Sequence, residues 1–154
     1  MVGCSSEDPR QVRAARDRSV VDSVAQQVRR APRVAPTGRW TQPQLTQRLV
    51  SAGLAPRPDD SLSAHPDYKV KPVGFLLGDA HLLAWMYSDS LARRAVSVSI
   101  DTLTAFPRDP ASAWAALPMF VVQNNLIAVI LGGTDRQRER IRLAIEAGLP
   151  VPPA

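Results

Sequence analysis

The sequence has one cysteine in 154 residues, Cys4, and two histidines, His65 and His81. A single cysteine cannot close a disulfide within the chain, and it cannot supply the paired thiolates of a common structural zinc site. Neither histidine has a second histidine or a cysteine at metal-ligand spacing, so the usual zinc ligand sets are missing. We therefore expect no resident metal ion and no cofactor.

Long apolar runs are also missing. The most hydrophobic stretch, residues 117–133, is interrupted by Gln123, Asn124 and Asn125. A membrane-spanning helix needs about 18 to 20 consecutive apolar residues, and no stretch of the sequence reaches that length. The sequence therefore predicts no membrane-spanning helix.

Lysine is scarce, because the 19 basic residues include only Lys69 and Lys71. The formal net charge of +5 is typical of proteins that bind nucleic acid or an anionic membrane surface. The distribution of this charge along the chain argues against such binding by the folded part. Residues 1–40 carry eight arginines against four acidic residues, a net +4, whereas residues 41–154 carry eleven basic and ten acidic residues, a net +1. Nucleic acid is thus not the favoured partner, and any contact of this kind is expected in the N-terminal part.

Recognisable catalytic motifs are missing as well. Neither a phosphate-binding glycine loop with its lysine nor the serine elbow of hydrolases is present. The adjacent carboxylates Asp59 and Asp60 lie in a loop, and His81 lies in an apolar strand, where a hydrogen-bonded or edge-facing role is expected. We therefore assign no catalytic residue. An enzyme with a site in the proline-rich loops 55–69 and 104–118 remains an alternative.

The N-terminal part, residues 1–39, reads as a polar, basic leader. A helix is predicted from Asp8 to Pro32, with valines at every fourth position from 20 to 28 and a proline at each end. Arg29 and Arg30 fall in its last turn and are candidate contacts for a partner or an anion. The proline-rich segment that follows is a linker.

The compact domain is predicted to cover residues 40–150, followed by a flexible tail at 151–154. Its first and last helices begin at Thr41 and Thr134, each with a glutamine three residues later, as in a capping box. Arg136, in the first turn of the last helix, is a candidate anion contact.

Two hairpins are predicted between these helices. One runs from about residue 70 to 87 around Gly78 and Asp79, and the other surrounds Asn124 and Asn125. Residues 89–100 fit either a helix capped by Asp89 or a strand, and we favour a short helix followed by an extended piece. The resulting fold class is α+β, a small two-layer domain in which helices pack on one face of an antiparallel sheet of two hairpins.

The first four residues, Met1-Val2-Gly3-Cys4, resemble the lipobox of bacterial lipoproteins. In that family the cysteine is diacylated and becomes the mature N-terminus, so the resemblance implies Cys4 as the lipidation site. It also implies a basic and then apolar signal segment upstream of Met1. Ser5 and Ser6, followed by the polar leader, resemble the tether that such proteins place between lipid and domain.

The favoured hypothesis is a non-enzymatic, lipid-anchored protein of the cell envelope whose domain binds a protein partner, as an accessory subunit of a membrane-associated assembly. The resemblance implies that the domain faces the periplasm, and Ser5 after the cysteine implies the outer membrane in a Gram-negative cell. The alternative is a soluble cytoplasmic protein whose arginine-rich leader binds nucleic acid or an acidic partner. The sequence does not fix the oligomeric state.

Overall fold

The computed structural model describes residues 38–62, 65–107 and 114–151, which all belong to the compact unit Ala35–Ala154. The predicted leader helix lies outside the described residues, and so do Cys4, Arg29 and Arg30. Within the described part, no helix is long and apolar enough to cross a membrane.

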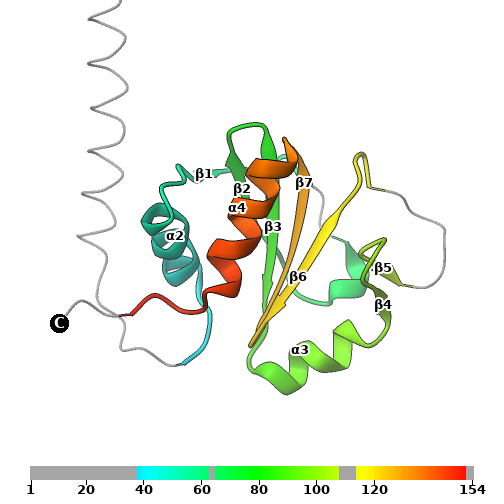
Figure 1. The fold of residues 1–154 in the computed structure, drawn as a ribbon. Coiled ribbons are helices and arrows are strands. Elements are labelled where there is room, and N and C mark those ends of the chain that lie inside the picture. The colour runs from blue at the N-terminus through cyan, green and yellow to red at the C-terminus, as the bar shows by residue number, and fades with distance from the viewer. Residues whose placement is uncertain (1–37, 63–64, 108–113, 152–154) are drawn as a thin grey trace, which may run out of the picture. The chain divides into compact units, whose positions relative to one another are not determined.

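A five-stranded sheet forms the centre of the domain, and every pair of neighbouring strands is antiparallel (Figure 1). In spatial order the strands are β1 (Arg57–Pro58), β2 (Val73–Leu77), β3 (Ala80–Met86), β7 (Leu126–Gly132) and β6 (Met119–Gln123). The two long strands β3 and β7 lie side by side in the middle, as their apolar sequences predict.

Both predicted hairpins are confirmed. Gly78 and Asp79 join β2 to β3, and Gly78 has a φ of +64°. Asn124 and Asn125 join β6 to β7, and Asn124 has a φ of +51°. Glycine and asparagine are the residues that tolerate a left-handed backbone most readily, which explains why these turns form there.

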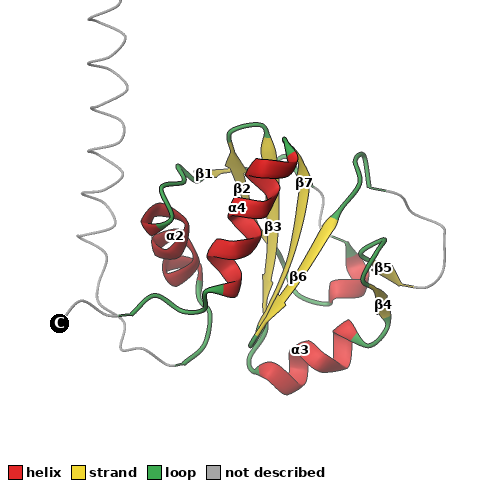
Figure 2. Cartoon of the chain, in the orientation of Figure 1, coloured by secondary structure: helices red, strands yellow, loops and turns green. Residues whose placement is uncertain are grey.

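Helices α2 (Gln42–Ser51) and α4 (Asp135–Glu146) pack on one face of the sheet (Figure 2). The predicted caps are present at both helices. The backbone N–H of Thr41 donates to Gln44 Oε1 at 3.0 Å, and in α4 the Thr134 hydroxyl accepts from the Gln137 N–H at 3.2 Å. Three groups of side chains form this core, namely Leu45 and Leu49 of α2, Ile141 and Ile145 of α4, and Leu82, Ala84, Ala128 and Ile130 of the central strands.

The opposite face of the sheet has its own core, so the prediction that helices cover one face needs a correction. Helix α3 (Ser90–Ser97) packs there with the 3₁₀ turn η1 (Pro66–Tyr68) and the short hairpin of β4 (Ile100–Asp101) and β5 (Phe106–Pro107). Alternate residues of β3 supply both cores, Leu82 to the first and Leu83 to the second. Burying such a side chain contributes about 1.5–3 kcal/mol, so both faces need cover. The α+β class itself is confirmed.

Candidate functional site

Helix α3 is fixed to the domain at its N-terminal end. The Asp89 carboxylate accepts from the Ala92 N–H at 2.8 Å, and this hydrogen bond holds the pKa of Asp89 below its usual range. Arg93 Nε donates to the Asn124 carbonyl at 2.9 Å, which ties the helix to the β6–β7 turn. The predicted helix at residues 90–97 is thereby confirmed: the Asp89 contact caps the helix, and the Arg93 contact holds it against the β6–β7 turn.

The outward face of α3 is apolar. Val96 is buried in the second core, whereas the exposed fractions of Leu91 and Val98 are 72% and 67%. Ala95 and Arg94 are exposed as well. Leu91, Ala95 and Val98 are spaced by four and then three residues, so they lie along one side of the helix and its C-cap. We call Leu91, Arg94, Ala95 and Val98 the α3 surface.

The loops 55–69 and 104–118 meet on the same face of the sheet, through aromatic rings. His65 lies 4.9 Å from Phe106 between ring centroids, and Phe106 stacks on Trp114 at 4.9 Å. Tyr68 stacks on Trp85 of β3 at 3.8 Å. The structure thus brings together the two loops that the sequence singled out for an enzyme site, and it does so through packed rings.

The tyrosine hydroxyls of this region hold backbone in place. Tyr68 donates to the Ala105 carbonyl at 2.6 Å, and Tyr87 donates to the Tyr68 carbonyl at 2.9 Å. Burial raises the pKa of Tyr68, and it raises the pKa of Tyr87 to about 12, so both hydroxyls stay protonated donors at neutral pH. The Tyr68 hydroxyl thus holds Ala105, which has a φ of +54°, and the Tyr87 hydroxyl holds the backbone of Tyr68.

Asp59 and His81 form a second polar contact outside the aromatic cluster. Asp59 Oδ2 lies 2.7 Å from His81 Nδ1, and because a carboxylate only accepts, the imidazole N–H is the donor. The Asp59 carboxylate also accepts from the Ser61 N–H at 3.0 Å, and hydrogen bonds from Ser61 and His81 lower its pKa. The expectation of a hydrogen-bonded His81 is confirmed. In the described ranges, no group of three or more His, Cys, Asp and Glu residues could hold a metal ion.

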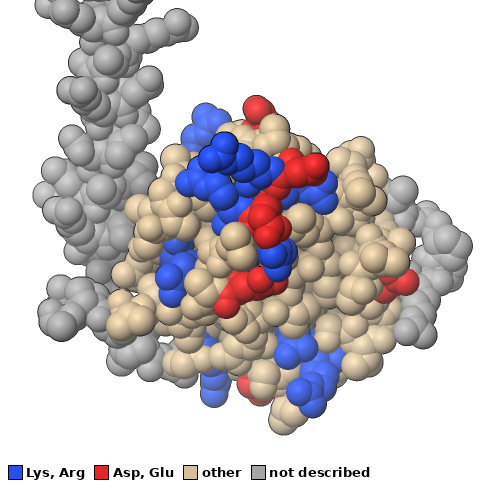
Figure 3. All heavy atoms as spheres, viewed as in Figure 1, with Lys and Arg blue, Asp and Glu red and all other residues tan. Residues whose placement is uncertain are grey.

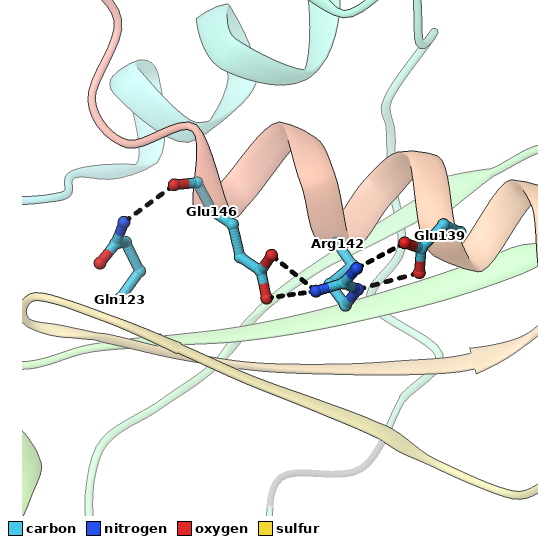
Figure 4. A network of polar contacts seen from close by, with 4 residues as sticks. All are labelled: Gln123, Glu139, Arg142 and Glu146. Atoms are coloured by element: carbon cyan, nitrogen blue, oxygen red, sulfur yellow. Dashed lines mark hydrogen bonds and ion pairs between the residues drawn. The ribbon is translucent and has the colours of Figure 1, made fainter.

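The arginines of α4 are largely engaged within the domain. Basic and acidic side chains alternate along this helix (Figure 3). Arg142 donates to both Glu139 and Glu146, which raises its pKa, and Gln123 Nε2 donates to the Glu146 carbonyl (Figure 4). Arg136, the predicted anion contact, is exposed at the N-terminal end of α4.

Sequence reasoning missed the α3 surface. It favoured the helix and its cap over a strand at residues 89–100, but it singled out no outward-facing side chain of that helix. The signal was present in the spacing of Leu91, Ala95 and Val98. That spacing also suits a buried face, and only the packing of Val96 into the core shows that the other side is outward.

We compared the chain with known protein families, curated proteins and solved structures. No protein-family model, no curated protein and no solved structure matches the chain.

Proposed function

We propose that the protein is a non-enzymatic, lipid-anchored protein of the cell envelope whose α+β domain binds a protein partner through the α3 surface. It acts as an accessory subunit of a membrane-associated assembly. The observation that carries the binding role is the outward apolar face of α3. Leu91 and Val98 are large aliphatic side chains more than half exposed on a helix whose opposite side is already packed.

The chemistry of the α3 surface indicates what it binds. Covering Leu91 and Val98 contributes at most about 1.5–3 kcal/mol for each side chain, so these two residues would be the apolar anchors of a larger interface. Arg94 lies among the apolar residues and adds a positive charge. The expected partner surface is therefore apolar with a carboxylate placed opposite Arg94, because a charge at the centre of an interface needs a partner.

The anchor is proposed from Met1-Val2-Gly3-Cys4. Lipid chains on Cys4 would bind the membrane by burying methylenes at about 0.8 kcal/mol each. Residues 5–39 are long enough to hold the domain away from the bilayer, and their arginines can approach anionic head groups. A partner on the same membrane then meets the α3 surface at a high effective concentration.

The test uses the complete gene in its own cells, with a photo-crosslinking amino acid at Leu91. Leu143, a leucine of α4 with an exposed fraction of 51%, is the matched control position. We expect one discrete adduct with a second protein at position 91 and none at position 143. Val98→Asp, which puts a carboxylate beside Arg94, should abolish that adduct, and Leu143→Asp should leave it unchanged.

Two outcomes would contradict the binding role. The first is no adduct at position 91, or the same adducts at both positions. The second is an adduct that survives Val98→Asp in a variant whose circular dichroism is unchanged, because the α3 surface would then not determine binding.

A further inference from the structure

The two edges of the central sheet are built differently. At the β2 edge, β1 contributes only two residues, one of them Pro58, and Asp59 then continues along β2. The Asp59 N–H donates to the Gly74 carbonyl at 3.0 Å. A Cβ at Gly74 would lie 2.0 Å from the Asp59 carbonyl oxygen, so the glycine is needed for this close approach. This edge is covered by its own chain.

The other edge is β6, and no further strand pairs with it among the described residues. Residues 119–123 read Met-Phe-Val-Val-Gln and carry no charge. Proteins that remain monomeric protect an edge strand with lysines, a proline inside the strand, a bulge or a covering segment. The nearest proline, Pro118, precedes β6, and the register of β6 with β7 is continuous over five residues. Within the described part of the chain, the β6 edge therefore lacks these protecting features and can pair with a further strand.

The hairpin geometry shows which backbone groups point outward. A two-residue turn closes on a hydrogen-bonded pair, here Gln123 with Leu126, and hydrogen-bonded pairs alternate along an antiparallel ladder. Gln123, Val121 and Met119 therefore use their N–H and C=O groups on β7. The corresponding groups of Phe120 and Val122 point away from the sheet, toward the open edge.

We propose that the β6 edge pairs antiparallel with β6 of a second copy of this chain, centred on Val121. In this register Phe120 lies opposite Val122 of the second copy, and Val122 opposite its Phe120. Both pairs are hydrogen-bonded pairs, so all four outward N–H and C=O groups of each copy are used. The arrangement is a closed twofold dimer in which the two sheets form one sheet of ten strands.

A second copy of β6 can use all the outward backbone groups of Phe120 and Val122, and it does so in only one register. If pairing were centred on Phe120, Val122 would face Pro118 of the second copy, which has no N–H to donate. If it were centred on Val122, Phe120 would face Asn124 in the turn. Only centring on Val121 uses the outward groups of both residues, and it places no charge opposite another charge.

The side chains agree with this pairing. Phe120 and Val122 are partly buried and pack at the margin of the second core. Pairing them with the same residues of a second copy extends that core across the twofold axis, where aromatic and β-branched residues make favourable cross-strand pairs. The dimer needs neither the α3 surface nor the lipid anchor, so it is independent of the proposed function.

The first test is the mass of the full-length chain by sedimentation velocity over a range of concentrations. The chain has a mass of 16.7 kDa, and we expect twice this mass with dissociation on dilution. Val122→Pro removes an outward N–H that β7 does not use, so it should keep the β6–β7 ladder and raise the dimer Kd at least about tenfold. Val122→Ala, which keeps the N–H and loses similar packing, is the matched control and should remain dimeric.

Hydrogen exchange of the native chain gives a second readout that needs no variant. The N–H groups of Phe120 and Val122 should be protected at high concentration and should exchange faster on dilution. A monomer at all concentrations would overturn the proposal, even with both groups protected, because a segment of the same chain would then cover β6. So would a dimer whose Kd is unchanged in folded Val122→Pro, or one in which these groups exchange rapidly.

Discussion

Asn125 binds the backbone of Trp40 from both directions. The Trp40 N–H donates to Asn125 Oδ1 at 2.6 Å, and Asn125 Nδ2 donates to the Trp40 carbonyl at 3.1 Å. The same amide nitrogen donates to the Tyr87 carbonyl at 2.8 Å. Asn125 is buried, with an exposed fraction of 1%. One side chain thus joins the start of the domain, the end of β3 and the β6–β7 turn.

Asn125→Ala should therefore destabilise the domain strongly. The substitution leaves one N–H and two carbonyl groups buried without their partner, and we expect the free energy of unfolding to fall by about 2–4 kcal/mol. Urea denaturation followed by tryptophan fluorescence measures this loss. Asn124→Gly, at the exposed neighbouring turn residue, is the control and should change stability by less than about 1 kcal/mol. Equal losses would contradict the role of Asn125.

Arg48 and Arg140 each bind the C-terminal end of the other's helix. Arg48 of α2 donates to the carbonyls of Gly148 and Leu149, both at 2.7 Å, and Arg140 of α4 donates to the Ala52 carbonyl at 3.1 Å. Arg48→Met should lower the free energy of unfolding by about 1–3 kcal/mol, because it removes two charge-assisted hydrogen bonds to helix-terminal carbonyls.

The Arg48 effect should exceed that of Arg140→Met, which removes one exposed contact and is expected to cost under about 1 kcal/mol. Urea denaturation of both variants checks the order. Arg48→Lys should recover only part of the loss, since lysine cannot reproduce the planar fork. Full recovery by lysine would show that charge alone matters at this position.

The Asp59–His81 contact predicts a pH dependence. Hydrogen bonds lower the folded-state pKa of Asp59 below its ordinary value of 3.8. A carboxyl group with a lowered folded pKa stabilises the protein above its ordinary pKa, and this contribution is lost as pH falls from that value through the folded pKa. Asp59→Asn should therefore cost more stability near about pH 6 than near about pH 3.

Urea midpoints of the native chain and of Asp59→Asn at both pH values measure this change. Asp60→Asn is the matched control, because Asp60 is adjacent to Asp59 and exposed. It should lower the stability only slightly at both pH values. A penalty for Asp59→Asn that grows on acidification would have the wrong sign and would exclude the ionised carboxylate as the stabilising form.

Lipidation of Cys4 predicts a change of cell fraction. When the gene is expressed with its natural upstream codons, the native protein should sediment with membranes and its N-terminal peptide should carry the mass of the acyl groups. Cys4→Ser should remove both properties, and Ser5→Ala, which changes the adjacent residue, should keep them. A native N-terminal peptide without acyl mass would reject the anchor, whatever the fractionation.

Much of the domain follows from local sequence signals. The caps at Thr41, Asp89 and Thr134 mark three helices, and the turns at Gly78 and Asn124 mark two hairpins. All five predictions rest on contacts within a few residues along the chain, where the physical chemistry of backbone hydrogen bonds is nearly independent of the rest of the molecule. The α+β class follows from the order of these elements.

The sequence by itself thus determined the helices capped at Thr41 and Thr134, the two hairpins, and the lipobox-like N-terminus on which the anchor is proposed. Only the tertiary structure decided that α3 covers the second face of the sheet and that Asn125 binds Trp40. It also decided that β1 pairs with β2 at one edge, whereas no described strand pairs with the outer side of β6. Trp40 and Asn125 are 85 residues apart in the chain. Apolar runs such as β3 and β7 show that both faces of a strand are buried, and they do not show which element covers each face.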